Sequence, residues 1–547
     1  MGERQQITMY AGKMWESYFL SETYCSSTAS EGRPCYAKEA GAIYDSSSSG
    51  NTPFISVRPG VYWSDSMDSS GSVPARYTDT FRLGEAISEW ATDKVDDLAM
   101  VLLNDTQLEY PNGKKYPLFA GCLSFGAAPG IVNHTFRVDP NTDAEGTNTS
   151  LIAGHFWEQR YIESMTFGMH IGSVQPQRIT GSLRFGGYDK NRAVGQVLAV
   201  PMTDPLHTWT GAPLLDITIE VVQGGSPFNF SSRSGYLASG NSTIGDRLDV
   251  NIDPCAPYLN LPKSTCDALA ADLPVKYSDD LGLYLWQTDS PAYAKIIQAP
   301  TALTFTFLDP NNNVRKVNIS VPFMHLNLTL EAPLVDRPTS YFPCNGASRG
   351  HYALGRAFLQ DAFFGSNLQS AFYFLAQAPG PKVGGEASTI IKQDATTIDA
   401  STHDWATSWK GVWSPLAEDG PVQNTTLDSL NNGGNASSSG TKTGLIAGLA
   451  GGLGGGLLLI GLIGWVLRAH TKKNGSVSIC GIPLTKSKKK TVGLDDNSSD
   501  KSRNAGLALS AQMSQQGRAE LSATSKPTQL PTPEDMVYEM PHDTYQP

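Results

Sequence analysis

One stretch of this chain carries no charged residue, and it constrains how everything around it can fold. Residues 443–467 read TGLIAGLAGGLGGGLLLIGLIGWVL. A run of about 25 apolar and small residues is long enough to cross a bilayer core of about 30 Å. Because a buried core helix rarely stays uncharged on every face for that length, the run predicts a single transmembrane helix.

Positive charge on the two sides of this run sets its orientation. Arg468, Lys472 and Lys473 follow it closely, whereas Lys442 alone lies just before it. The positive-inside rule therefore places the C-terminus in the cytoplasm and residues 1–442 outside. The chain has a net charge of −11, and the segment after the run is basic, so the part outside is acidic. An acidic ectodomain argues against nucleic acid as a partner.

Sequons and cysteines agree with passage through the secretory pathway. Six of the seven cysteines precede the apolar run, an even number that suits disulfides. Nine N-x-Ser/Thr sequons, which are acceptors for N-linked glycans, also precede it. Their asparagines are Asn104, Asn133, Asn148, Asn229, Asn241, Asn318, Asn327, Asn424 and Asn435. The plasma membrane or a membrane of the secretory pathway is the predicted location.

The first residues do not supply the signal that such a route requires. The stretch MGERQQITMYAG has no apolar h-region, although an ectodomain of this size is normally translocated through one. We therefore expect a further segment to precede this sequence.

Composition divides the part outside into a globular region and a stalk. Up to about residue 380 the pattern is mainly β, with alternating runs such as LDITIEVV at 215–222 and few helices, the clearest at 150–162 and 263–272. Ser264 or Thr265 is expected to cap the second helix. Residues 381–442 turn to Ser, Thr, Gly and Asn and predict a flexible stalk, and residues 468–547 predict a disordered tail.

Five motifs in the globular region resemble those of pepsin-like aspartic proteases, in the same order. They are GAIYDSSSS at 41–49, YTDTF at 77–81, FAGCLSFG at 119–126, GSLRFGGYD at 181–189 and YALGRAFL at 352–359. The resemblance implies two β-rich lobes, at 1–187 and 188–380, with a cleft between them and one catalytic loop from each. A single membrane span and a basic tail after the last lobe resemble a group of membrane-anchored fungal members that have lost the catalytic motifs.

The chemistry of that family sets a strict requirement. Two carboxylates share one proton and bind one water, because two like charges about 3 Å apart cannot both ionise. Each carboxylate sits in an Asp-Thr/Ser-Gly-Thr/Ser turn, where glycine permits close approach and the hydroxyls support the carboxylate.

Asp253 is the candidate for the second carboxylate. It ends an apolar run in NIDPCAPYL at 251–259, as the resemblance implies. Pro254 stands where the family has a hydroxyl residue, Cys255 where it has glycine, and Ala256 where it has the next hydroxyl. Proline offers no N–H and alanine no hydroxyl, so the carboxylate is expected to lose its usual supports.

The first carboxylate is missing. Counting back without a gap from Cys25 places Gly12 at its position, where it is non-catalytic, and no aspartate precedes Asp45. Glu16 is the nearest carboxylate, four residues too late and on a longer stem.

The resemblance also orders the cysteines. Cys25 with Cys35 and Cys266 with Cys344 correspond to the family's usual bridges. Cys122 and Cys255 remain, and they either form a bridge that fastens the two lobes or stay as two buried thiols.

No metal site or cofactor is predicted, because the nine histidines show no ligand spacing. Gly448, Gly452 and Gly456 recur every fourth position in the membrane run and would permit a homodimer.

These observations predict a membrane-anchored glycoprotein whose pepsin-like part is catalytically impaired and binds a peptide or a cell-wall polymer. Two alternatives stay open. One is an active aspartic endopeptidase that uses Asp253 at acid pH, and the other is a signalling or adhesion protein that works through its tail.

Overall fold

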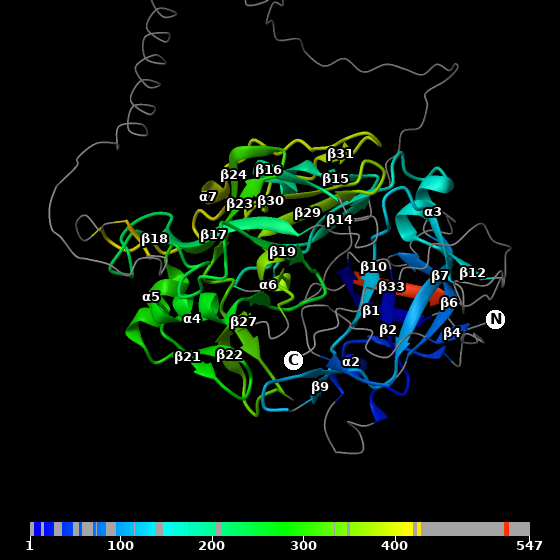
Figure 1. The fold of residues 1–547 in the computed structure, drawn as a ribbon, viewed down its shortest axis with the longest axis horizontal. Coiled ribbons are helices and arrows are strands. Elements are labelled where there is room, and N and C mark those ends of the chain that lie inside the picture. Colours follow the sequence, from blue (N-terminus) through cyan, green and yellow to red (C-terminus); the bar gives the residue numbers. More distant parts are fainter. Residues whose placement is uncertain are drawn as a thin grey trace, which may run out of the picture. The chain divides into compact units, whose positions relative to one another are not determined.

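The structure is a computed structural model, drawn as a ribbon in Figure 1. It describes residues 5–12, 16–26, 35–46, 54–56, 69–72, 74–83, 94–113, 115–136, 146–173, 176–202, 211–332, 334–346, 350–418, 424–427 and 519–524. Contacts divide the chain into two compact units, residues 1–431 with 505–547 and residues 432–504. All described residues belong to the first unit.

The N-terminal strands form a ten-stranded sheet, here called the first sheet. Its order is β11-β12-β7-β2-β10-β1-β33-β6-β4, with β3 beside β2. The strands are β1 (Gln5–Gly12), β2 (Ser17–Ser21), β3 (Ile43–Tyr44), β4 (Ile55–Ser56), β6 (Ala75–Leu83), β7 (Lys94–Leu103), β10 (Gly121–Ser124), β11 (Asn133–Phe136), β12 (Thr147–Ser150) and β33 (Ala519–Thr524). Next to it β5 (Ser69–Ser70), β8 (Gln107–Glu109) and β9 (Lys115–Pro117) make a small three-stranded sheet.

The C-terminal half contains a nine-stranded sheet, here called the second sheet. Its order is β24-β23-β17-β19-β28-β20-β27, with β18 beside β17 and β32 beside β18. The strands are β17 (Ala212–Val221), β18 (Ser232–Ser234), β19 (Leu248–Ile252), β20 (Leu259–Leu261), β23 (Thr301–Asp309), β24 (Asn312–Pro322), β27 (Cys344–Gly346), β28 (Ala353–Leu354) and β32 (Thr425–Thr426). Four more strands form a separate sheet, β21 (Val275–Ser278), β22 (Leu283–Trp286), β25 (Leu328–Leu330) and β26 (Thr339–Phe342).

A third sheet takes strands from distant parts of the sequence and joins the two halves. Its order is β14-β13-β29-β30-β16. The strands are β13 (Thr166–His170), β14 (Ser182–Phe185), β16 (Val194–Pro201), β29 (Ala362–Asn367) and β30 (Phe372–Gln377). In Figure 1 β16 and β30 lie next to β23 and β24 of the second sheet. The mainly β fold expected from the sequence is confirmed.

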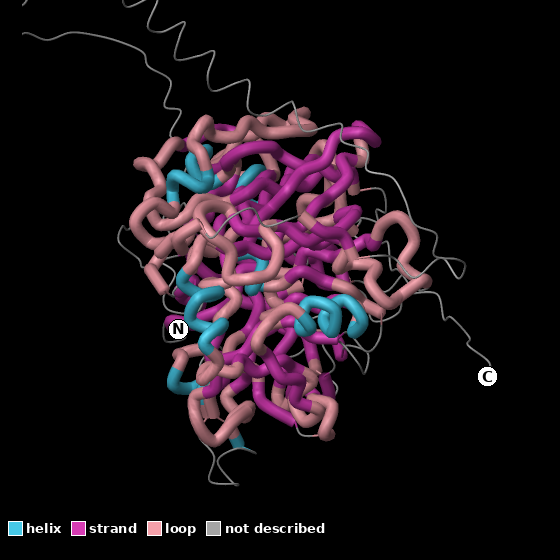
Figure 2. The backbone as a smooth tube through the Cα atoms, turned by 90° about the vertical axis from the view of Figure 1, so that its left-hand side faces the viewer, coloured by secondary structure: helices cyan, strands magenta, loops and turns pink. Residues whose placement is uncertain are grey.

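The helices are few and short, as Figure 2 shows. They are α2 (Tyr36–Glu39), α3 (Ile152–Glu158), α4 (Lys263–Ala271), α5 (Pro291–Gln298), α6 (Arg356–Leu359) and α7 (Trp405–Ser408), with a 3₁₀ turn at Lys190–Arg192. Both expected helices are present as α3 and α4. The expected cap of α4 is wrong, because Pro262 occupies the N-cap and no side chain bonds there. Pro262 has φ −53° and ψ 138°, so it lies just outside the helix, which begins at Lys263.

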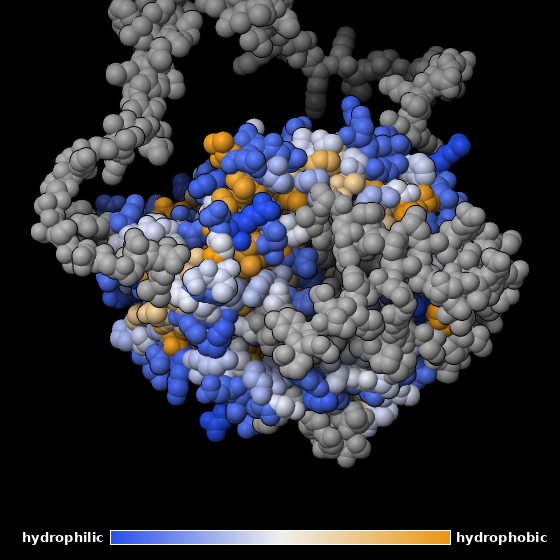
Figure 3. Space-filling view, viewed as in Figure 1, coloured by the Kyte–Doolittle hydropathy of each residue, from blue (hydrophilic) through white to orange (hydrophobic). Residues whose placement is uncertain are grey.

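Apolar side chains from both halves form one continuous core. It includes Met9 and Met100 of the first sheet, Phe305 and Ile319 of the second, and Phe364 of the joining sheet. The described surface in Figure 3 is mostly hydrophilic, with small hydrophobic groups. Val314 and Ile390 are the large apolar side chains exposed among the described residues. The hydrophobic effect therefore holds the two halves together as well as each half internally.

The stalk prediction begins too early. Residues 388–390 form β31 (Ser388–Ile390), which pairs with β15 (Gly187–Asp189), and α7 follows. Trp409 is fully buried beside Gly380, where an added Cβ would lie 2.7 Å from the indole ring. Three tryptophans in this segment outweigh its Ser/Thr-rich average composition, because each buries a large apolar surface.

Residues 519–524 of the predicted disordered tail form β33, which is antiparallel to both β1 and β6. The neighbouring strands β1 and β6 each present an edge of N–H and C=O groups there, and such edges accept an added strand. At these six residues the structure therefore differs from the expected disorder.

Among the described residues no helix is long and apolar enough to cross a membrane. The predicted span at 443–467 lies outside them, as do Asn435, Gly448, Gly452 and Gly456.

Candidate functional site

Two strand ends occupy equivalent places in the first and second sheets. β1 runs parallel to β10, with Ala11 opposite Leu123, and β19 runs parallel to β28, with Ile252 opposite Leu354. Leu123 belongs to the motif FAGCLSFG and Leu354 to the motif YALGRAFL. Gly12 follows Ala11 at the end of β1, and Asp253 follows Ile252 directly after β19. The register of the sheets thus supports the same assignment of Gly12 that the gapless count gave.

Gly12 has no room for a side chain. A Cβ placed on it would lie 2.5 Å from Sγ of Cys122 and 3.0 Å from Sγ of Cys255. Real Cβ atoms do not approach other heavy atoms below about 3.0 Å. The two sulfur atoms therefore occupy the space into which a carboxylate at position 12 would extend.

These sulfur atoms form a disulfide. Cys122 lies in β10 and Cys255 in the turn after β19, with Cα atoms 6.1 Å apart, inside the range that a disulfide spans. Both side chains are buried. Of the two possibilities that the sequence left open, the structure contains the bridge.

The other two disulfides follow the pairing that the resemblance implied. Cys25 is bonded to Cys35, and Cys266 to Cys344. Each closes a loop within one half of the chain, whereas the bridge from Cys122 to Cys255 connects the halves across 133 residues of sequence.

Asp253 is 8% exposed, and its carboxylate stabilises its own turn. Oδ1 accepts hydrogen bonds from the backbone N–H groups of Cys255 at 3.0 Å and Ala256 at 3.3 Å. The expectation that this carboxylate loses its supports is therefore wrong in part. Backbone donors replace the missing hydroxyls, as in an Asx-turn, and they do not depend on the side chains at those positions.

Arg356 connects the two strand ends, and sequence reasoning missed it. Its Nη1 donates to the carbonyl oxygens of Cys255 at 2.6 Å and Pro254 at 3.4 Å. Its guanidinium carbon lies 3.7 Å from the centre of the Tyr10 ring in β1, a cation–π contact. The available signal was YALGRAFL itself, in which arginine replaces the aspartate of the family pattern.

Glu16, the nearest carboxylate before Asp45, takes no part in this site. It forms an ion pair with Arg76 of β6. Among the described residues no group of three or more His, Cys, Asp or Glu side chains could hold a metal ion.

Three tyrosines, here called the tyrosine cluster, fill the space beside the disulfide. Tyr110 and Tyr258 share a hydrogen bond of 3.0 Å between their hydroxyls, and Tyr258 meets Tyr341 edge to face at 6.0 Å. All three are buried together with Cys122 and Cys255. Burial raises the pKa of each hydroxyl well above its usual value, so the cluster is neutral. The sequence gives no pattern that brings these tyrosines together.

The sequons fall into two groups. Asn104, Asn229, Asn318 and Asn424 are exposed, whereas Asn133, Asn148, Asn241 and Asn327 are half-buried. Several of the half-buried ones hold hydrogen bonds, for example Asn327, whose Oδ1 accepts from the Tyr293 hydroxyl at 3.2 Å.

Comparison with known proteins found a similarity to one protein family. The model of the eukaryotic aspartyl protease family matches residues 127–378, a range that contains Asp253 but begins after Gly12 and Cys122. Barrierpepsin of Saccharomyces cerevisiae is 27% identical over 221 residues, which are 40% of this chain. The matched region spans 33% of the length of that relative.

Proposed function

The chain belongs to the pepsin-like aspartic protease family, and we propose that it is a member that has exchanged catalysis for binding. One observation carries the proposal. The sulfur atoms of Cys122 and Cys255 fill the space beside Gly12, the position that the resemblance implies for one catalytic carboxylate. A single remaining aspartate cannot share a proton with a partner, so the acid–base pair that activates water is absent.

The surroundings of Asp253 support the same conclusion. Its Oδ1 is occupied by two backbone N–H groups, and the tyrosine cluster fills the neighbouring space. Because Asp253 is buried, little of its carboxylate is accessible to a peptide. Binding is therefore assigned to the outer surface of the two pepsin-like lobes, with a peptide or a cell-wall polymer as the ligand.

Proteolysis at acid pH is the alternative function, and an activity assay distinguishes it from the proposal. Full-length protein is purified in detergent and incubated with a denatured protein substrate between pH 3 and 7, with and without a statine-type inhibitor. We expect no cleavage above background. Cleavage that is blocked both by the inhibitor and by Asp253→Asn would establish the active enzyme instead.

The assay needs a check of folding at low pH. Burial lowers the pKa of His170 to about 3 and that of His134 to about 4. The unfolded chain binds these protons near pH 6.5, so stability falls as the pH drops from 6.5 towards those values. For the fully buried His170 the slope is up to about 1.4 kcal/mol per pH unit. Urea unfolding at each pH shows where the protein is still native, and inactivity counts only there.

The binding role has its own experiment. Full-length protein is mixed with insoluble cell-wall polysaccharide or with immobilised denatured peptides, and the bound fraction is measured by sedimentation. Saturable binding that Asp253→Asn leaves unchanged supports the proposal. Absence of saturable binding to either material contradicts it.

We propose further that the chain is anchored by residues 443–467, in the plasma membrane or a secretory-pathway membrane, with its tail in the cytoplasm. The pairing of β33 with β1 requires instead that residues 519–524 and the first sheet share one side. Cys480, the seventh cysteine, is a natural probe of this difference. In intact cells that glycosylate the protein, a membrane-impermeant maleimide should label Cys480 only after the membrane is permeabilised. Labelling of intact cells that is lost in the Cys480→Ser variant would contradict the topology.

A role carried by the tail remains the second candidate. It predicts that deletion of residues 468–547 reproduces the phenotype of deleting the whole gene, whereas our proposal predicts this for deletion of residues 1–380. Comparison of the two deletions separates them.

A further inference from the structure

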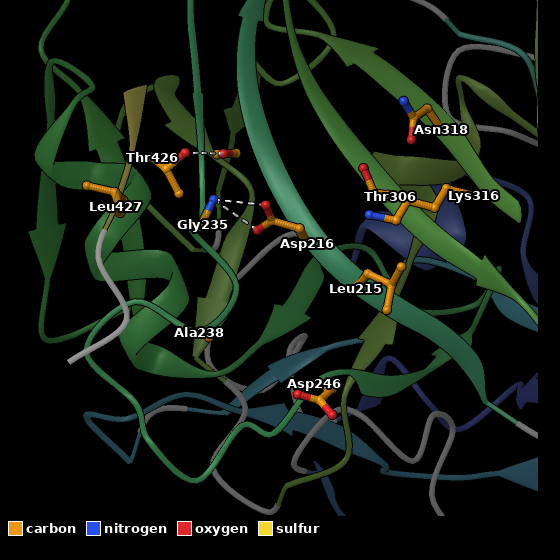
Figure 4. A pocket seen from close by; sticks show the side chains of 11 residues that line it. Leu215, Asp216, Gly235, Ala238, Asp246, Thr306, Lys316, Asn318, Thr426 and Leu427 are labelled. Carbon is orange, nitrogen blue, oxygen red and sulfur yellow. Dashed lines mark hydrogen bonds between the residues drawn. The ribbon is translucent and has the colours of Figure 1, made fainter. Parts of the chain in front are cut away.

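A pocket of about 680 Å³ lies on the second sheet, separate from the strand ends described above. Figure 4 shows the side chains around it. They come from β17, β23 and β24, from the turn after β18, and from β32 at the end of the folded segment. Its volume is within the range of small-ligand sites, which is about 300–1,000 Å³.

One row of polar side chains crosses the pocket from strand to strand. Asp216 of β17 is directly opposite Thr306 of β23, and Thr306 is directly opposite Asn318 of β24. Directly opposed residues project from the same face of a sheet with Cβ atoms about 5 Å apart. Lys316 precedes Asn318 by two residues and therefore shares that face. The row thus leads from Asn318 across the pocket to Asp216.

The lining suits a ligand that carries many hydroxyl and amide groups. Asp216 and Asp246 offer carboxylate acceptors, Lys316 offers an ammonium donor, and Thr306 and Thr426 offer hydroxyls. Asp216 already accepts from the Gly235 N–H at 2.9 Å through Oδ2, which fixes its carboxylate in the pocket wall. The lining contains no aromatic side chain.

Asn318 is also the first residue of the sequon Asn318-Ile319-Ser320. Of the eight sequon asparagines in the described residues, it is the one that lines this pocket, and it is exposed. A sugar attached to its amide would begin at the edge of the pocket, so that a covalent link holds the ligand at high effective concentration.

We propose that the first sugars of an N-linked glycan on Asn318 lie in this pocket. Their hydroxyls donate to the carboxylates of Asp216 and Asp246, and Lys316 donates to an acetamido oxygen. The glycan would then join β24 to β32, the last described strand before the apolar run. The proposal rests on passage through a glycosylating compartment and does not depend on whether the protein is catalytic.

The test measures how well each glycan is protected in the native protein. Full-length chain is produced in a glycosylating host and treated with peptide-N-glycosidase, and release is followed site by site by mass spectrometry. Asn104 is the matched control, because it is an exposed sequon that lies outside the pocket lining. We expect release from native Asn318 to be about tenfold slower than from Asn104, the protection that about 1.4 kcal/mol of contact free energy gives. After denaturation the two rates should be equal.

Two variants separate the pocket from other causes of slow release. Asp246→Asn with Lys316→Ala keeps the sequon intact and removes two of the proposed contacts, so release from native Asn318 should approach that from Asn104. Asn318→Gln should lower the thermal midpoint more than Asn104→Gln does. An unoccupied Asn318, release as fast as from Asn104, or protection unchanged by the double variant would each overturn the proposal.

Discussion

The ends of β1 and β19 occupy equivalent positions in the strand register, but a glycine stands at the first end and an aspartate directly after the second. The second end keeps its carboxylate, and Asp253 is held by the N–H groups of Cys255 and Ala256. The first end has neither a carboxylate nor space for one, because Gly12 faces the disulfide between Cys122 and Cys255. In the function that we propose, Asp253 alone is no sign of catalysis, because the equivalent first end offers no carboxylate to share its proton.

The largest expected effect comes from removing the link that distinguishes the two ends. Replacing Cys122 and Cys255 by alanine removes a bridge across 133 residues, which the chain-entropy model values at about 5 kcal/mol. The matched control is the bridge from Cys25 to Cys35, whose separation is 10 residues and whose value is about 3 kcal/mol. Urea unfolding without reductant should rank the two double variants in this order. A smaller loss for Cys122 and Cys255 would show that the bridge does not constrain the two halves.

The second effect tests whether Gly12 and the bridge depend on each other. Gly12→Ala places a Cβ 2.5 Å from Sγ of Cys122, and such overpacking costs about 1–3 kcal/mol. In the background that lacks both sulfur atoms, the same substitution should cost less, because the next contact of the added Cβ is the Leu123 carbonyl oxygen at 3.1 Å. The double-mutant cycle measures the coupling. Equal costs in the two backgrounds would mean that the sulfur atoms do not limit the side chain at this position.

The sequence predicted much of this comparison, for identifiable reasons. The position of Gly12 follows from a gapless count back from Cys25. The bridge between Cys122 and Cys255 was only one of two alternatives for the remaining cysteines, the other being two buried thiols. Arg356 and the tyrosine cluster could not be predicted in this way. Arg356 and Tyr10, like Tyr110 and Tyr258, are more than a hundred positions apart in the sequence, and no local period or spacing records their contacts.

Composition misled the assignment of the segment after residue 380 for a related reason. An average over Ser, Thr and Gly indicates a stalk, yet Trp405, Trp409 and Trp413 pack together there and Trp409 meets His325 at 5.0 Å. A few large side chains decide the fold of such a segment, because burial scales with apolar area and not with the number of residues.

Arg356 gives a smaller and more local test of the connection between the two ends. Arg356→Lys keeps the charge but loses the planar group that stacks on Tyr10 and reaches two carbonyl oxygens at once. We expect a loss of about 1–2 kcal/mol. Tyr10→Leu removes the ring alone, and the two losses should not add. Additive losses would mean that Arg356 acts only through the turn of Cys255.

The smallest effect is expected at the residue that looks most catalytic. Asp253→Asn keeps Oδ1 as an acceptor for the N–H groups of Cys255 and Ala256, so the free energy of unfolding should change by less than about 1 kcal/mol. Asp253→Ala removes this acceptor and leaves the Cys255 N–H without it, whereas the Ala256 N–H still donates to the carbonyl oxygen of residue 253 at 3.1 Å. The expected cost is about 1–3 kcal/mol. If the asparagine variant is as unstable as the alanine variant, the negative charge itself stabilises this turn. The second strand end would then differ from the first in electrostatics as well as in shape.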